Sequence, residues 1–142
     1  MLAGSDRSAI DGKGRVVVPS KLRAALPDGD LVVCWEPDGC LSLYTLEVWK
    51  ERVRRIDESS RDVMEARMRK RFLFARTEVV RRDPQGRVSL PKHLLQEAGI
   101  EGEAVVVGVG NRIELWAPAK WEALMARQQT IIEHNPGEIL TP

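Results

Sequence analysis

The sequence has little of what an enzyme or a metal site would need. It contains only two cysteines and two histidines, and neither His93 nor His134 stands at a metal-ligand spacing with cysteines or carboxylates. Cys34 and Cys40 are too few for a disulfide framework, so we expect both to be reduced, small, buried side chains. No nucleophile–base pair is evident. These shortages argue against an enzyme and predict no metal, no cofactor and no small-molecule substrate.

Long hydrophobic runs are also missing. The longest apolar runs, such as residues 104–107, fall far short of the ~20 residues that cross a bilayer. The first residues, MLAGSD, have neither the basic start nor the apolar stretch of a secretory signal. With 43% hydrophobic and 30% charged residues, the composition is that of an ordinary globular protein. We therefore expect a cytoplasmic protein without membrane contact.

The net charge is only +1, but it is unevenly distributed. Residues 50–82 hold twelve Lys and Arg against six Asp and Glu, whereas residues 96–142 hold three against seven. Such a division suggests a polyanionic partner for one surface. A charged helix that simply faces water would give the same pattern, so charge alone leaves both interpretations open.

The most informative feature is a nine-residue phrase that occurs twice. Residues 11–19 read DGKGRVVVP and residues 83–91 read DPQGRVSLP, 72 residues apart. Apolar and aromatic positions continue to match at the same offset, ending with Trp49 and Trp121. Repeats of this kind indicate duplicated structural units. We expect each half to contain a hairpin, a short helix, a second hairpin and a closing helix.

Each copy of the phrase predicts a tight hairpin. Asp at the first position and Gly at the fourth suit a type I turn that ends in a left-handed glycine. The predicted arms are residues 5–10 with 15–18, and residues 78–82 with 87–90. Because side chains alternate along a strand, Val16 and Val88 should face the core, while Arg15 and Arg87 should point the other way.

Turn residues and apolar spacing predict the remaining elements. Short helices should begin at Pro19 and Pro91, strands should cover residues 31–35, 41–44, 104–109 and 112–116, and Thr45 should cap a helix to about residue 56. Ser59 or Ser60 should cap a central basic helix through about residue 74, with an apolar stripe that includes Met64, Met68 and Phe72. Residues 128–142 show no clear period and are expected to fray.

Arg15 and Arg87 are the strongest candidates for a binding role. Both follow a turn glycine at equivalent positions, and a guanidinium forms paired hydrogen bonds with phosphates or guanine edges. Two such hairpins side by side would make a basic ribbon able to enter a DNA groove. Alternatively, each arginine pairs with Asp11 or Asp83 and only stabilises its turn. The residues alone favour neither reading.

The doubled DxxGR phrase, together with GCLSLY, GVGNRIELW and the arginine-rich central helix, resembles the MraZ family of bacterial transcriptional regulators over roughly residues 1–127. The resemblance implies an α+β fold made of two tandem AbrB-like swapped-hairpin repeats, which form a small pseudo-symmetric, β-barrel-like core with flanking helices. The expected boundaries are 1–58 for the first repeat, 59–76 for the connecting helix, 77–127 for the second repeat and 128–142 for a mobile tail.

The same resemblance implies a sequence-specific binder of double-stranded DNA. It would act in the nucleoid, on direct-repeat operator sites at the promoter of the division and cell-wall gene cluster, including its own operon. It would assemble with itself into a ring. By position, Arg15 and Arg87 would read the DNA, with Lys13 of the first turn in support. A protein-interaction module such as an AbrB-like antitoxin is the alternative.

Overall fold

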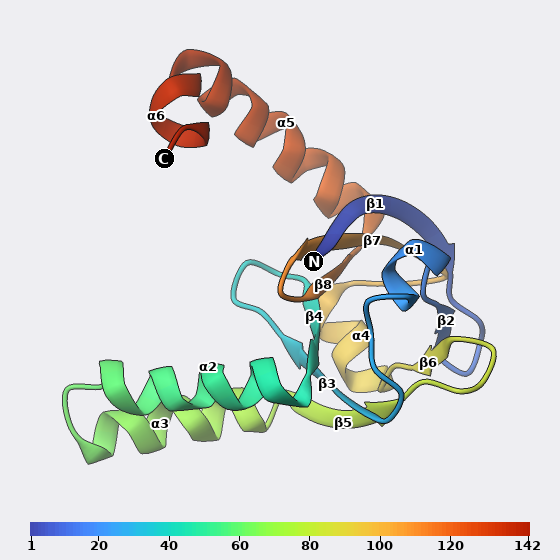
Figure 1. Ribbon diagram of the computed structural model, residues 1–142, viewed down its shortest axis with the longest axis horizontal. Coiled ribbons are helices and arrows are strands. Elements are labelled where there is room, and N and C mark those ends of the chain that lie inside the picture. The colour runs from blue at the N-terminus through green and yellow to red at the C-terminus, as the bar shows by residue number, and fades with distance from the viewer.

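The computed structural model describes all residues, 1–142. It is a mixed α and β protein built from an antiparallel sheet, a separate two-stranded ribbon and several helices (Figure 1). In chain order the elements are β1 (Leu2–Ala9), β2 (Arg15–Val17), α1 (Ser20–Arg23), β3 (Asp30–Trp35), β4 (Leu41–Thr45), α2 (Leu46–Ser59), α3 (Val63–Phe74), β5 (Thr77–Arg81), β6 (Arg87–Ser89), α4 (Lys92–Ala98), β7 (Glu103–Gly110), β8 (Ile113–Trp116), α5 (Pro118–His134) and α6 (Pro136–Leu140).

The large sheet is open, which corrects the expectation of a barrel-like core. Its six strands run in the order β1-β7-β8-β4-β3-β5, so β1 and β5 are edges and do not pair with each other. The two central strands, β8 and β4, come from different halves of the chain and pair through residues such as Ile113 and Leu43. The halves therefore share one sheet, and the sheet ends in two free edges.

The predicted hairpins also differ from the structure. The arms of each turn meet only at one isolated bridge, Ile10 with Val16 and Arg82 with Val88. Beyond that bridge, β1 pairs with β7 over its full length, and β5 pairs with β3. The strands that leave the turns, β2 and β6, pair with each other instead. Local turn chemistry fixed the turn itself, while the shared core decided which strands pair.

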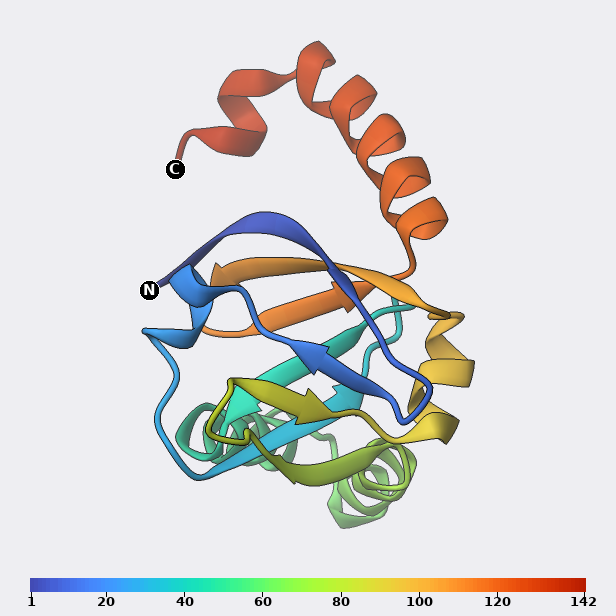
Figure 2. The same cartoon turned by 90° about the vertical axis from the view of Figure 1, so that its right-hand side faces the viewer.

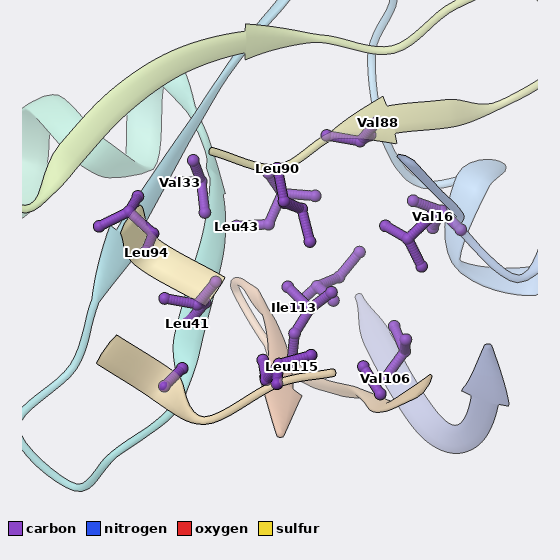
Figure 3. Packing of buried hydrophobic residues seen from close by; sticks show 14 of the residues in the cluster. Val16, Val33, Leu41, Leu43, Val88, Leu90, Leu94, Val106, Ile113 and Leu115 are labelled. Carbon is purple, nitrogen blue, oxygen red and sulfur yellow. The ribbon is translucent and has the colours of Figure 1, made fainter. Parts of the chain in front are cut away.

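One apolar cluster of twenty buried residues lies between the large sheet and the ribbon. In Figure 3 the side chains of Val16 and Val88 point toward those of Leu90, Ile113 and Val106. All five are no more than 3% exposed. Burial of apolar side chains contributes about 1.5–3 kcal/mol for each large one. The ribbon is therefore held on the sheet by the core beneath it.

The opposite face of the sheet is covered by helices. Thr45 caps α2, as predicted, because its hydroxyl accepts a hydrogen bond from the amide of Val48 at 3.3 Å. Trp49 of α2 lies against Tyr44, with ring centroids 5.7 Å apart, and against Phe74, at 5.6 Å. Helices α2 and α3 form an antiparallel arm that projects from the sheet (Figure 1).

The structure differs from the sequence expectations for the helices at the cap of α3 and in the C-terminal segment. The cap of α3 is Asp62, whose carboxylate accepts from the amide of Glu65 at 2.8 Å, and not Ser59 or Ser60. The predicted apolar stripe of α3 is largely exposed, since only Ala66 and Leu73 of this helix are buried. The segment expected to fray is helical. Helix α5 continues to His134 and α6 follows it, although neither helix contains a buried residue.

Candidate nucleic-acid interface

The first turn is fixed by its aspartate. The Gly14 amide donates to the Asp11 carbonyl at 2.9 Å, which closes the turn. The Oδ1 atom of Asp11 accepts from the amides of Lys13 and Arg15, both at 2.9 Å. An aspartate that binds the backbone two and four residues ahead holds the turn without help from other elements. The predicted turn is confirmed.

The second turn repeats this arrangement. The Gly86 amide donates to the Asp83 carbonyl at 2.9 Å, and Oδ1 of Asp83 accepts from the amides of Gln85 at 3.0 Å and Arg87 at 2.9 Å. Gly86 and Gly14 share a φ of +79°, a left-handed conformation that favours glycine. The duplicated phrase therefore folds into two equivalent turns.

The strands after the turns pair across the halves. In the antiparallel β2–β6 register, Arg15 lies opposite Ser89 and Val17 opposite Arg87, with Val16 opposite Val88 at the centre. Two further backbone bonds extend the pairing, from Val18 to the Gly86 carbonyl at 3.1 Å and from Leu90 to the Gly14 carbonyl at 2.9 Å. We call this pair of strands the ribbon.

Paired positions of an antiparallel ladder lie on the same face. Val16 and Val88 occupy the inner face and are 1% and 0% exposed. The outer face carries the other four side chains of the ribbon, which are Arg15, Val17, Arg87 and Ser89. In Figure 2 the ribbon faces the viewer, with one turn at each end. The structure thus brings the two predicted arginines onto one exposed face.

Both arginines are also paired with carboxylates, as the turn-stabilising alternative predicts. The Nε atom of Arg15 donates to Oδ2 of Asp11 at 2.6 Å, and Arg87 makes the same bond to Asp83, also at 2.6 Å. The Nη atoms of both arginines have no hydrogen-bond partner in the chain, and the side chains are 35% and 36% exposed. Each carboxylate orients a guanidinium and leaves its outer nitrogens free.

The same contacts lower the pKa of both aspartates. Hydrogen bonds from the Arg15 amide, then from its side chain, hold the pKa of Asp11 below its usual value. The amide of Arg87, followed by its side chain, lowers the pKa of Asp83. Both aspartates therefore stay ionised at neutral pH, and the four charges at the ribbon form two matched pairs.

The other predicted residue, Lys13, lies at the exposed tip of the first turn. The equivalent tip of the second turn is Gln85, whose carbonyl accepts from Nη1 of Arg23 at 2.9 Å. Arg23 of α1 was not singled out from the sequence, because its partner is 62 residues away and no local pattern signals it. Lys13 is two residues from Arg15 and belongs to the first turn. Arg23 contacts the second turn through this hydrogen bond.

The two cysteines take no part in this site. Both are fully buried and unpaired with each other, as expected from the sequence. Burial raises the pKa of both thiols, with the carboxylates of Glu36 beside Cys34 and Glu114 near Cys40 acting in the same direction. They are neutral thiols at physiological pH and pack as small apolar groups. No cluster of three potential metal ligands is present.

No helix combines the length and apolar character that crossing a membrane requires. A solution structure of a Pyrococcus horikoshii protein aligns with 83% of this chain and 97% of its own, with 17% identity and a TM-score of 0.33. That similarity is too low to identify a shared fold.

Sequence comparison gives a much closer match. The family model described as "MraZ protein, putative antitoxin-like" matches the chain twice, over residues 1–72 and 73–138, in agreement with the duplication. A protein of Natranaerobius thermophilus is 34% identical over 99% of this chain and 97% of its own. One from Thermomicrobium roseum is 39% identical over 87% and 86%, and one from Ligilactobacillus salivarius 39% over 87% and 85%. All three are named transcriptional regulator MraZ, a class of proteins that are not enzymes. The doubled turn motif, its two matches to one family model and these full-length relatives together show that the chain belongs to the MraZ family.

Proposed function

We propose that the protein is a sequence-specific, DNA-binding transcriptional regulator, and that the outer face of the ribbon contacts the duplex. One observation carries this proposal: Arg15 and Arg87 share an exposed face, with their Nη atoms free. Arginine is the side chain that most often reads guanine, through its O6 and N7 atoms. Lys13, at the exposed tip of the first turn, supplies a phosphate contact.

The dimensions of the ribbon suit the major groove of B-DNA. That groove is about 12 Å wide and admits a two-stranded ribbon as well as a helix. Arg15 and Arg87 stand at diagonal positions of the pairing, with Cα atoms roughly 7–8 Å apart. That separation allows them to reach different base pairs. The exchange of strands between the halves supports two swapped-hairpin repeats of the AbrB type as the origin of this ribbon.

Binding would take place at direct repeats in the promoter of the division and cell-wall gene cluster, including the protein's own operon. With a net charge of +1 per chain, a monomer gains little from nonspecific attraction to phosphates. Several ribbons on one assembly add their weak contacts through a high effective concentration. A ring of identical subunits in the nucleoid would supply such an array.

The surface offers two complementary faces for that assembly. Met64, Met68 and Phe72 recur every fourth residue of α3 and are 64%, 60% and 53% exposed; we call them the α3 stripe. A groove of about 520 Å³ adjoins it between α2 and α3, with Arg52 and Arg55 at its rim. Contiguous exposed apolar surface of this kind marks interaction sites.

The C-terminal helices fit as the matching face. Helix α5 is the counterpart of α2, since Trp121 corresponds to Trp49, but no helix covers α5 as α3 covers α2. Residues 128–142 expose Ile131, contain two glutamates and have no Lys or Arg. Docking of these helices on the α3 stripe of the next subunit is a head-to-tail contact, which gives a ring where the rotation from one subunit to the next closes.

A binding experiment with the DNA upstream of the protein's own gene tests the function. The wild type should retard this duplex at concentrations that leave a scrambled duplex of the same composition free. The Arg15→Ala/Arg87→Ala double variant should lose that discrimination, whereas Arg54→Ala, which removes an exposed arginine of α2 outside the ribbon, should keep it. Unchanged discrimination in the double variant would limit both arginines to stabilising the turns.

Two observations favour the antitoxin-like alternative. The family model is described as putative antitoxin-like, and the exposed α3 stripe is a surface on which another protein can pack. The same experiment separates the two functions. A protein-interaction module would fail to distinguish the upstream duplex from the scrambled one at any concentration.

A further inference from the structure

The outer face of the ribbon carries a single apolar side chain, and that side chain distinguishes the two halves. At the offset of 72 residues Arg15 corresponds to Arg87, but Val17 corresponds to Ser89. Because β2 and β6 are antiparallel, Arg87 lies opposite Val17 and Arg15 lies opposite Ser89. An approximate twofold axis through the central valine pair therefore relates the two ends of the ribbon. Each end carries an arginine, but the residue opposite that arginine is a serine at one end and a valine at the other.

The fold does not require an apolar residue at position 17. Val17 is 46% exposed, so it contributes little to the core, which is served by Val16 on the inner face. Ser89 occupies the equivalent position, and its strand keeps the same pairing with a polar side chain there. Val17 is thus available to contact a partner that approaches the arginines.

The chemistry of the major groove identifies that contact. Thymine alone presents an apolar group there, its C5 methyl, whereas a serine hydroxyl can donate to or accept from any base edge. We infer that Val17 packs against a thymine methyl beside the base read by Arg87, while Ser89 makes a polar contact beside the base read by Arg15. This inference rests on the proposed function.

The two turns also differ in polarity, as Val17 and Ser89 do. Lys13 stands at the tip of the turn that leads into Arg15, and Gln85 at the tip of the turn that leads into Arg87. One end of the ribbon thus combines a positive charge with a hydroxyl, and the other combines a neutral amide with an apolar group. A duplex element read by such a face is not palindromic, and the ribbon binds it in one orientation. Repeats of that element would all point the same way along the DNA.

Uracil scanning of the upstream duplex tests the inference. Uracil lacks only the C5 methyl of thymine, so each substitution removes one methyl and no hydrogen-bonding group. In the wild type, uracil at one thymine position in each repeat should lower the affinity about fourfold, the value expected for one lost buried methyl group. In Val17→Ser that sensitivity should vanish. In Ser89→Val a second sensitive position should appear in a duplex that carries a thymine at the position related to the first by the twofold axis.

The control is Val63→Ser, which makes the same change at an exposed valine at the start of α3, on the arm away from the ribbon. It should leave the wild-type scan unchanged. If the wild type binds the duplex but no uracil weakens it, or if Val17→Ser retains the sensitive position, the inference is overturned while the proposed function stands. If the wild type does not prefer the upstream duplex to a scrambled one, the proposed function fails as well.

Discussion

Arg15 is joined to Asp11 by a 2.6 Å hydrogen bond from Nε to Oδ2, while its two Nη atoms remain without a partner in the chain. In the proposed function, the pair combines a structural and a binding role in one side chain. The carboxylate sets the direction of the guanidinium, and the outer nitrogens stay available for a ligand. Pre-orientation of this kind lowers the entropy cost of binding.

The fork of the guanidinium, and not only its charge, should matter for recognition. Arg15→Lys and Arg87→Lys keep the positive charge but lose the paired donors that match guanine. Each should reduce discrimination between the upstream and scrambled duplexes by roughly 5- to 150-fold, the equivalent of about 1–3 kcal/mol, while the affinity for scrambled DNA changes little. Titrations at a fixed salt concentration measure both quantities, with Arg54→Lys, at an exposed arginine of α2, as the matched control. Equal losses on both duplexes would contradict base reading.

The turn aspartates should make stability depend on pH only in acid. Their pKa values in the folded protein lie below the usual 3.8, because backbone amides and arginines stabilise the charged form. Their contribution to stability is therefore fully present above about pH 4 and is lost as the pH falls through the lowered values. Thermal unfolding of the wild type and of Asp11→Asn/Asp83→Asn between pH 2 and 7 should show curves that differ at neutral pH and converge in acid. A constant difference across the range would exclude this linkage.

Glycine should be essential at position 14 and dispensable at position 12. A Cβ on Gly14 would lie 2.5 Å from the Leu90 carbonyl oxygen, and its φ is +79°, whereas a Cβ on Gly12 would meet nothing within 4 Å. Gly14→Ala should lower the free energy of unfolding by at least about 1 kcal/mol, since it strains the turn and displaces a ribbon contact. Gly12→Ala should change it by less than about 0.5 kcal/mol. Urea unfolding compares the two, and similar losses would argue against close packing at the turn.

A charge in the α3 stripe should disrupt the proposed assembly and spare the fold. Met68→Glu replaces an exposed apolar residue, 60% accessible, with a charge that cannot be buried without a large cost. Gel filtration with light scattering should show a smaller particle than the wild type, and the affinity for DNA with several repeats should fall much more than the affinity for a single repeat. Val79→Glu, at an exposed valine of β5, is the control. A wild-type-sized particle in Met68→Glu would remove the α3 stripe from the interface.

Local features of this protein could be predicted from the sequence, and pairings between distant strands could not. Asp11 and Gly14 specify a turn by themselves, and alternation placed Val16 inward and Arg15 outward. The pairing partner of β2 depends instead on which strand lies next to it over the common core. No local pattern in the sequence indicates that this strand is β6. The α3 stripe shows a related limit, because apolar spacing indicates a helix face but not whether the chain itself covers that face.

The residues of the candidate site also divide into those that local sequence indicates and those that depend on distant contacts. Arg15 and Arg87 could be identified because the phrase is repeated, and Lys13 because it sits in the first turn. A DNA role for all three stays a proposal. Arg23 could not be found, since its contact with the Gln85 carbonyl arises only when α1 of one half meets the turn of the other. Asp62 replaced the expected serine cap because its carboxylate is well placed for the amide of Glu65.

The exchange of β2 and β6 has a consequence for how such a protein can diversify. In a dimer of two identical chains that exchanged these strands, every substitution would appear in both copies of the strand. Here both copies lie on one polypeptide, so a gene can alter one strand and leave its twin untouched, as positions 17 and 89 already differ. The two ends of the ribbon can therefore differ in chemistry while their backbone pairing stays the same.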